Sequence, residues 1–278
     1  MIIYIHGFGG SGLGGKASVL KESMREHGGI IAPSLPTNPH LAIQTLSELI
    51  ESFRQKDNVY LIGSSLGGYY ALHLSSKYNL PAVLINPAIK PYETLRRALG
   101  YAPNFYDGST YEWREEHLDI LKSLETDQYD TSKLLVLLQK GDELLDYQDA
   151  LAKLDGARFV VEDGGSHSFD GIERHVDTIQ DFFSLYGTVL TELFARISDA
   201  DVQKFLCTVD KKDLVYAMAS LPDVVQDRIF DNLTQKAKDG IKEEIAFAGR
   251  DITPQSAREA IEGLDKVAKE LFSNLLEQ

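Results

Sequence analysis

The chain of 278 residues has few cysteines, few basic residues and no long apolar run, and each of these shortages excludes a class of protein. Its single cysteine, Cys207, rules out an intramolecular disulfide and favours a reducing, cytoplasmic setting. We expect Cys207 itself to be a small buried apolar residue. No apolar run approaches the roughly 20 residues that cross a bilayer. The start, MIIYIHGFGG, lacks the basic region and cleavage site of a signal peptide and indicates a strand.

Basic residues are also fewer than acidic ones, and the histidines are confined to the first part of the chain. The 28 Lys and Arg residues face 42 Asp and Glu residues, which gives a net charge of −14, and no basic stripe interrupts the excess. Nucleic acid and anionic membrane surfaces would be repelled, so we expect neither as a partner. All seven histidines precede residue 176. Because histidine is the usual proton carrier near neutral pH, we expect catalysis in the first part of the chain.

The first two thirds of the chain alternate short apolar runs with helical patterns. The six expected strands are Ile2–Ile5, Ile30–Ala32, Val59–Ile62, Ala82–Ile85, Leu134–Leu138 and Phe159–Val161. Amphipathic segments lie between most of them, for example at 41–54 and 65–77. Apolar strands separated by helices are typical of a parallel sheet covered on both faces. The pattern therefore predicts an α/β fold.

Two features interrupt this alternation. Residues 88–132 form a long insertion rich in aromatic residues, and such a connection is commonly a lid or a binding loop. Beyond residue 187 only helical patterns remain, with Ser198 and Thr253 as expected caps and a last helix over Pro254–Leu276. We expect one domain over 1–187 and a small all-helical domain over 188–278.

The glycine-rich segment GFGGSGLGGKA, residues 7–17, fits three motifs. A dinucleotide site needs an acidic residue at the end of the second strand, and none is present there. A phosphate-binding P-loop needs Ser or Thr where Ala17 stands. The third interpretation is a loop that offers a backbone N–H to an oxyanion, as in α/β hydrolases. Phe8 is the favoured donor, and Gly9 is the weaker alternative.

Two adjacent serines lie in the segment GSSLGG, between an apolar strand and a helical pattern. In the nucleophile elbow G-x-S-x-G, the residues two before and two after the serine must be small. Gly63 and Gly67 satisfy this rule around Ser65, whereas Ser64 would have Ile62 and Leu66 as neighbours. Ser65 is therefore the candidate nucleophile. The N–H of Leu66 is the second expected oxyanion donor.

A serine nucleophile needs a histidine base and an acid, in the chain order Ser, Asp or Glu, His. Asp142 follows the fifth expected strand; its competitor Asp146 is expected one turn into the next helix. His167 lies in the glycine-rich loop after the sixth strand. His175 falls in a helical pattern and is expected on the surface. Ser65, Asp142 and His167 thus form the candidate triad.

Several segments of the first part carry a family resemblance: YIHGF, GSSLGGYYA, LPAVLINPA, GDELLDY and GGSHSFDGIE. Over about residues 1–186 the chain resembles the YqiA-type family of small bacterial esterases in the α/β-hydrolase superfamily. The resemblance implies a triad of Ser65, Asp142 and His167, with Phe8 and Leu66 at the oxyanion hole. It implies hydrolysis of carboxylic esters or acyl thioesters through an acyl-enzyme, with no metal or organic cofactor.

The second part resembles another family, the C-terminal domain of the flagellar motor-switch protein G (FliG), over about residues 192–275. That family meets the stator through charged residues on one helix. Lys236, Glu243 and Glu244 match three of these positions, whereas Ala219 replaces a basic one. The resemblance implies a protein-binding module. The alternative to an esterase is therefore a non-catalytic scaffold that binds proteins through both parts.

Overall fold

A computed structural model describes residues 1–25, 29–54, 58–186, 189–194, 196–218, 221, 223–248 and 252–276. It divides into two compact units, Met1–Ile179 and Gln180–Gln278. The division falls inside helix α7 (Val176–Ser184), before the boundary that the sequence predicts at residue 187. Gly187 and Ala219 lie outside the described residues, so the predicted boundary stays a prediction.

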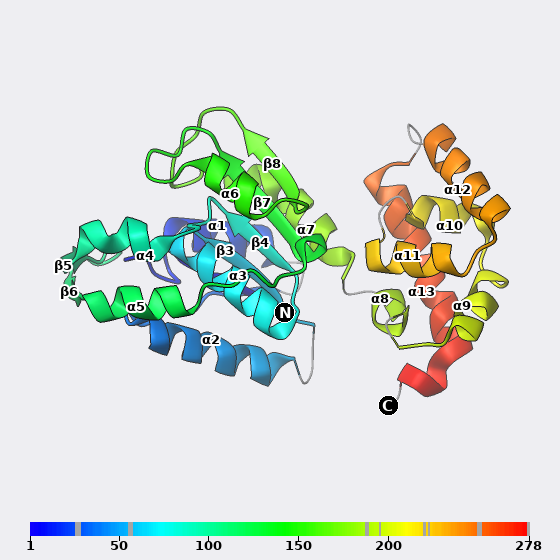
Figure 1. The fold of residues 1–278 in the computed structure, drawn as a ribbon, viewed down its shortest axis with the longest axis horizontal. Coiled ribbons are helices and arrows are strands. Elements are labelled where there is room, and N and C mark those ends of the chain that lie inside the picture. Colours follow the sequence, from blue (N-terminus) through cyan, green and yellow to red (C-terminus); the bar gives the residue numbers. More distant parts are fainter. Residues whose placement is uncertain are drawn as a thin grey trace. The chain divides into compact units, whose positions relative to one another are not determined.

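The first unit is built on a six-stranded sheet in the order β2-β1-β3-β4-β7-β8, with every neighbouring pair parallel (Figure 1). The strands are β1 (Ile2–Ile5), β2 (Ile30–Ile31), β3 (Tyr60–Ser64), β4 (Ala82–Ile85), β7 (Leu134–Gln139) and β8 (Arg158–Glu162). The predicted strands lie within two residues of these bounds at each end. The predicted α/β fold is confirmed.

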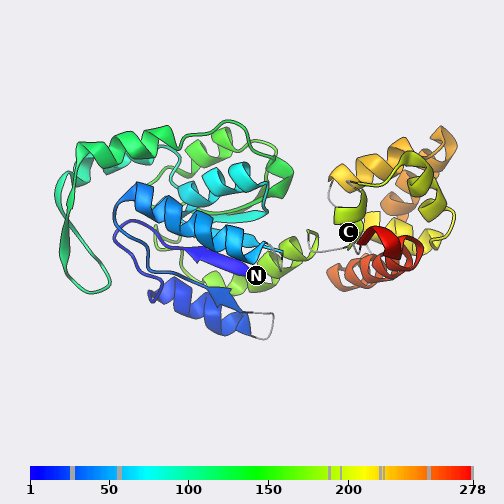
Figure 2. The same cartoon turned by 90° about the horizontal axis from the view of Figure 1, so that it is seen from below.

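Helices cover both faces of this sheet (Figure 2). The covering elements are α1 (Gly15–Ser23), α2 (Pro39–Phe53), α3 (Leu66–Tyr78), α6 (Tyr147–Lys153), the 3-10 turns η3 (Thr131–Lys133) and η4 (Ile172–His175), and the start of α7. Every residue of β1, β4 and β7 is buried. Strands buried on both faces must be apolar along their whole length, which explains the continuous runs of Ile, Leu and Val.

The insertion at 88–132 folds into α4 (Pro91–Thr94), η2 (Leu95–Ala98), strands β5 (Gly100–Pro103) and β6 (Thr110–Trp113), and α5 (Glu115–Ser123). The two strands form an antiparallel hairpin, which contacts the glycine-rich loop at residues 7–17. The Phe105 N–H donates to the Gly9 carbonyl at 2.7 Å, and the buried Trp113 ring meets the Phe8 ring edge-on at 4.9 Å. The insertion therefore packs directly against the loop expected to bind an oxyanion.

The second unit contains helices joined by turns and no strand among its described residues. The helices are α8 (Val189–Phe194), α9 (Asp199–Leu206), α10 (Lys211–Met218), α11 (Asp223–Asp231), α12 (Gln235–Ala248) and α13 (Pro254–Leu276). Ser198 caps α9, and the Thr253 hydroxyl accepts from the Ser256 N–H at 3.1 Å at the start of α13, as predicted. The expected burial of Cys207 is wrong: it is exposed, because Val202 and Phe205 form the buried face of α9.

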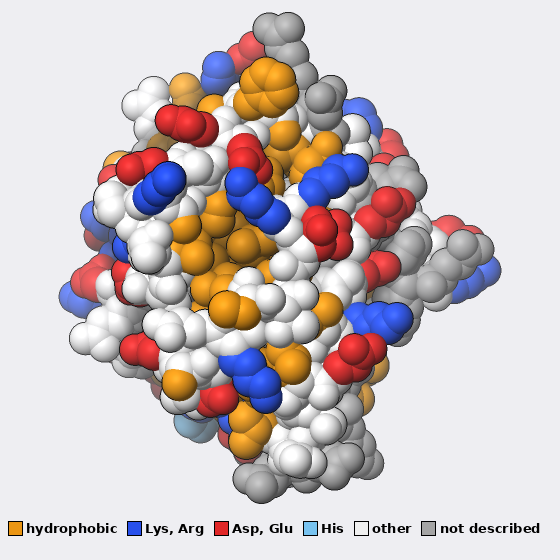
Figure 3. Space-filling model, turned by 90° about the vertical axis from the view of Figure 1, so that its right-hand side faces the viewer, with side chains coloured by type: hydrophobic (Ala, Val, Ile, Leu, Met, Phe, Trp, Pro, Cys, Tyr) orange, Lys and Arg blue, Asp and Glu red, His pale blue; other side chains and the backbone are white. Residues whose placement is uncertain are grey.

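The surface of the helical unit carries an apolar area. On the face drawn in Figure 3, hydrophobic side chains gather in a hollow with Lys, Arg, Asp and Glu side chains around it. On α12 the Phe247 side chain is 92% exposed, and Glu244 pairs with Lys211. None of the described helices in either unit is both long and apolar enough to span a membrane.

Candidate active site

Ser65 stands on a strained turn between β3 and α3. Its φ of 56° and ψ of −121° lie in a region that non-glycine residues rarely enter. The turn is held by the Ser65 N–H, which donates to Ile85 O at 3.0 Å, and by the Ser65 carbonyl, which accepts from the Ala88 N–H. This is the backbone of a nucleophile elbow, which projects the hydroxyl above the sheet.

Two glycines make this turn possible. A Cβ atom at Gly63 would lie 2.2 Å from Gly67 O, and one at Gly67 would lie 2.1 Å from Ile5 O. Both distances are far inside van der Waals contact, and the obstructing atoms are backbone, which cannot move aside cheaply. The glycines therefore serve close approach between β1, β3 and α3, as the spacing rule predicts.

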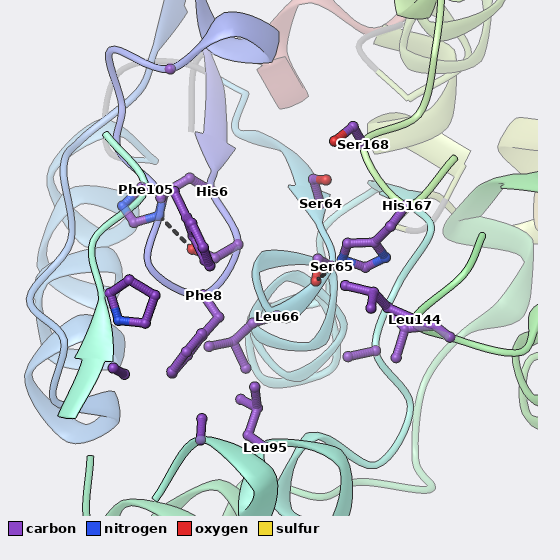
Figure 4. Close-up of a pocket in the computed structure, with 18 of the residues that line it drawn as sticks. His6, Phe8, Ser64, Ser65, Leu66, Leu95, Phe105, Leu144, His167 and Ser168 are labelled. Atoms are coloured by element: carbon purple, nitrogen blue, oxygen red, sulfur yellow. Dashed lines mark hydrogen bonds between the residues drawn. The ribbon is translucent and has the colours of Figure 1, made fainter. Parts of the chain in front are cut away.

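The neighbouring Ser64 has a different role. Its side chain is 2% exposed and hydrogen-bonds to Tyr4, whose pKa is raised by burial. Both serines border the cavity (Figure 4), but Ser64 is the buried last residue of β3, whereas Ser65 is partly exposed and its hydroxyl meets His167. Of the two adjacent serines, Ser65 is the one that the backbone turns toward a histidine.

The three candidate triad residues meet in one line of hydrogen bonds. His167 Nε2 lies 2.9 Å from Ser65 Oγ, and His167 Nδ1 lies 2.9 Å from Asp142 Oδ2. Figure 4 shows Ser65 and His167 side by side at the edge of the cavity. The three side chains come from the elbow after β3, the turn after β7 and the loop after β8, which are the carboxyl ends of parallel strands.

Asp142 is placed to remain a carboxylate. Its side chain is 3% exposed, and burial alone would raise its pKa. Hydrogen bonds from His167 and from the N–H groups of Leu144 and Leu145 outweigh burial and hold the pKa of Asp142 below its usual range. A carboxylate at this point makes His167 Nδ1 carry the proton, which leaves Nε2 free to accept one from Ser65.

The competing acid and base lie elsewhere. Asp146 is not one turn inside the next helix, as expected: it is the N-cap of α6 and accepts from the Gln148 N–H at 2.9 Å. His175 is not on the surface, as expected. It is buried in η4, with Nε2 3.1 Å from Glu162 Oε1 and the Phe169 ring against its own ring. Neither residue takes part in the line through Ser65.

The two expected oxyanion donors, the N–H groups of Phe8 and Leu66, belong to residues that line the same cavity as Ser65. Over the described part of the chain, neither the Phe8 nor the Leu66 N–H has a hydrogen-bond acceptor, and both residues line the cavity. Both backbone polar groups of Gly9 already have partners. Its carbonyl accepts from the Phe105 N–H, and its N–H donates to the Tyr111 hydroxyl. Burial raises the pKa of Tyr111 to about 12, and the hydrogen bond from Gly9 acts in the opposite direction. The favoured donor Phe8 remains a prediction that this geometry permits.

His6 shapes the loop that carries Phe8. The Leu35 N–H donates to His6 Nε2 at 2.9 Å, so the ring proton lies on Nδ1, which donates to Gly7 O at 2.8 Å. Burial lowers the pKa of His6 and keeps this ring neutral. The side chain therefore fixes the turn after β1 and is a structural histidine.

Gln139 and Asn86 position the loop that carries His167, and the sequence did not single them out. Gln139 is 1% exposed, and its Oε1 accepts from the N–H groups of Ser166 (3.1 Å) and Asp170 (2.8 Å). Asn86 Oδ1 accepts from the Gln139 N–H, and Asn86 Nδ2 donates to Ser166 O at 3.0 Å. The only sequence feature that could have indicated Gln139 is its place as a polar residue at the end of an apolar strand, and this feature does not show which residues it contacts.

Replacing Gln139 with methionine is expected to lower kcat/KM about 10- to 100-fold, because two loop N–H groups lose their acceptor and His167 shifts. Urea unfolding should also show a loss of about 1–3 kcal/mol, the cost of an unsatisfied buried polar group. Gln148→Met on α6 is the matched control. Equal rates for the two variants would contradict the positioning role.

The cavity beside Ser65 has a volume of about 720 Å³. Its apolar wall comes from the glycine-rich loop, the elbow and the insertion, and consists mainly of Phe8, Leu66, Leu95, Leu99, Tyr101 and Phe105 (Figure 4). Among the described residues, no group of three or more His, Cys, Asp and Glu side chains is placed to hold a metal ion. A cavity of this size fits a small ligand with an apolar portion.

The parallel sheet and the elbow define the class of protein: the first unit has the α/β-hydrolase fold. Solved structures with this fold include Est1E from Butyrivibrio proteoclasticus with bound ferulic acid, at a TM-score of 0.54 and 15% identity. The match covers 66% of this chain and 87% of that one. Mouse alpha/beta hydrolase domain-containing protein 10 gives 0.53 and 18%, with 66% and 88% covered.

The family follows from the sequence of the same unit. Residues 1–184 match the uncharacterised protein family UPF0227, and the chain belongs to that family. YcfP of Salmonella arizonae is 26% identical over 192 residues, and a UPF0227 protein of Pectobacterium carotovorum is 25% identical; each match covers 66% of this chain and 99% of the relative. Residues 188–274 match the FliG C-terminal domain, so both resemblances predicted from the sequence are confirmed.

Proposed function

We propose that this chain is a serine esterase that hydrolyses carboxylic esters or acyl thioesters through an acyl-enzyme. The observation that carries the proposal is the unbroken line from Ser65 Oγ through His167 to the buried Asp142 carboxylate. It stands on a strained elbow at the edge of an apolar cavity, where a nucleophile would meet substrate.

The geometry supports a two-step reaction. Ser65 Oγ attacks the substrate carbonyl while His167 Nε2 takes the hydroxyl proton, and the N–H groups of Phe8 and Leu66 receive the oxyanion. His167 then gives the proton to the leaving alcohol or thiol, which departs and leaves an acyl group on Ser65. Water, deprotonated by His167, attacks the acyl carbonyl and releases the carboxylic acid and free Ser65.

A fluorophosphonate probe tests this function, because it reacts with an activated serine hydroxyl. Incubating the folded protein and mapping the adduct by peptide mass spectrometry should place it on Ser65. Heat-denatured protein, in which the triad is taken apart, should take no label. Absence of label on Ser65 in folded protein would refute the esterase and favour the non-catalytic scaffold.

We also propose that the helical unit binds a protein partner. The match to a FliG C-terminal domain supports this, as does the apolar hollow with charged surroundings, since such exposed patches commonly mark interaction sites. Lys236, Glu243 and Phe247 are all exposed on α12.

Phe247→Asp in the full chain is expected to abolish capture of the partner, because a carboxylate would be buried where an aromatic ring makes contact. Affinity capture from a cell extract, with wild type and variant compared by quantitative mass spectrometry, measures this. Leu41→Asp, an equally drastic change of an exposed apolar residue on α2, is the control. Identical sets of captured proteins in all three samples would contradict the proposal.

A further inference from the structure

Two cationic side chains line the cavity beside Ser65, in a chain whose net charge is −14. Lys16 comes from the first turn of α1, and Arg97 comes from η2 in the insertion. The cavity lining includes a single acidic residue, Glu143. Among the described residues that line the cavity, cationic side chains thus outnumber acidic ones, and the catalytic steps described above use neither cation.

Arg97 pairs with no acidic side chain of the described residues. Its neighbour Arg96 pairs with Glu115 at 2.9 Å, whereas Arg97 lines the cavity and has no carboxylate within ion-pair distance among the described residues. A guanidinium is always charged and presents a planar set of donors that matches a carboxylate or a phosphate. The insertion therefore brings an uncompensated anion-binding group to the cavity.

Lys16 is held next to the catalytic loop. Its Nζ donates to Ser168 O at 2.6 Å, one residue beyond His167, and its two other N–H groups have no acceptor among the described residues, so they can bind a ligand. Burial lowers the pKa of Lys16 to about 8, against the opposing effect of Asp142 and Asp170, so the side chain is still a cation at pH 7. The lysine of the incomplete P-loop motif thus faces the same space as Ser65.

Glu143 does not cancel these charges. Its Oε2 accepts from the His167 N–H at 3.0 Å, and this hydrogen bond lowers the pKa of Glu143 and keeps it anionic. Among the described residues that line the cavity, two cations thus stand against one carboxylate that is already engaged in the catalytic loop, and the nearby Asp142 carboxylate is engaged with His167. Lys16 is partly buried, where electrostatic attraction is stronger than on an open surface, whereas Arg97 is exposed to solvent.

We infer that the cavity selects esters or thioesters bearing an anionic group, a carboxylate or a phosphate, joined to the reacting carbonyl by an apolar segment. Arg97 and Lys16 bind the anion, and the apolar wall of the insertion and elbow receives the segment. This inference rests on the esterase function proposed for the same site and names its substrate class.

The experiment compares 4-nitrophenyl esters of three acids: pentanoic, glutaric and 4-phosphonobutanoic acid. The first is neutral, the second ends in a carboxylate and the third ends in a phosphonate, so the last two distinguish the kinds of anion. At pH 7 and low salt, each rate is divided by the alkaline hydrolysis rate of that ester. We expect kcat/KM at least about tenfold higher for one anionic ester than for the neutral one.

Variants assign this preference to the cavity. Arg97→Gln should lose most of the preference, mainly through KM, while Arg96→Gln on the same turn should keep it. Adding 0.5 M NaCl should reduce it as well, because salt screens an exposed charge. Equal preference in the Arg97→Gln and Arg96→Gln variants, or a faster neutral ester in the wild type, would overturn the inference.

A binding measurement separates failure of the inference from failure of the esterase function. The Ser65→Ala chain should bind the intact anionic ester at least about tenfold more tightly than the neutral one in calorimetry, and the double variant with Arg97→Gln should not. Hydrolysis of the neutral ester without any anionic preference would reject the inference and leave the esterase standing. Anion binding that depends on Arg97, with no ester hydrolysed and no probe on Ser65, would reject the esterase and keep the anion site.

Discussion

Replacing Ser65 with alanine is expected to lower kcat for ester hydrolysis by as much as about 10⁶-fold, which is the cost of losing the nucleophile of such a triad. The hydroxyl that attacks the carbonyl is gone, and no other side chain occupies its place 2.9 Å from His167 Nε2. The variant should also take no fluorophosphonate label. Steady-state assays on purified protein, with active sites counted by burst titration in the wild type, measure the loss.

Ser64→Ala is the matched control for this experiment, because it removes a hydroxyl from the adjacent residue. Ser64 is buried against Tyr4 and makes no hydrogen bond to His167 among the described residues. We expect the variant to keep its label on Ser65 and to lose no more than about tenfold in rate, as for a neutral hydrogen bond. A larger loss in Ser64→Ala than in Ser65→Ala would reverse the assignment of the nucleophile.

Much of the fold could be predicted because its constraints are local. A parallel strand buried on both faces must be apolar along its length, so β1, β4 and β7 stand out in the sequence. The elbow is marked by a short spacing rule: backbone atoms of Gly67, four residues on, and of Ile5 in the neighbouring strand β1 leave no room for a side chain at Gly63 and Gly67. Ser65 could therefore be distinguished from Ser64 by spacing alone.

The contacts that hold the site together could not be predicted in the same way. Gln139 and Asn86 hold the loop of His167 from β7 and from the end of β4, which are far apart in sequence. His175 and Cys207 were wrongly placed, because burial depends on which face of a short helix meets the rest of the molecule. Arg97 and Arg96 are indistinguishable in sequence, and only the folded insertion gives one a partner and turns the other to the cavity.

Replacing Asp142 with asparagine is expected to lower kcat about 10⁴-fold, through the tautomer of His167. Asp142 Oδ1 accepts from the N–H groups of Leu144 and Leu145, both at 2.9 Å. Those two donors will keep the asparagine oxygen at that position, which is 3.0 Å from His167 Nδ1, and place its NH₂ group where Oδ2 now lies nearer to Nδ1, at 2.9 Å. An amide donor there requires Nδ1 to be unprotonated, so the proton moves to Nε2, which can no longer accept from Ser65.

Asp146→Asn is the control that tests the choice between the two acids. Asn caps a helix about as well as Asp, so α6 should stay intact and the rate should remain near that of the wild type. Thermal unfolding of both variants checks that the fold is kept. A larger loss in Asp146→Asn than in Asp142→Asn would contradict the triad. The expected order follows from geometry, because the Asp142 carboxylate contacts His167 whereas the Asp146 carboxylate contacts a helix N-terminus.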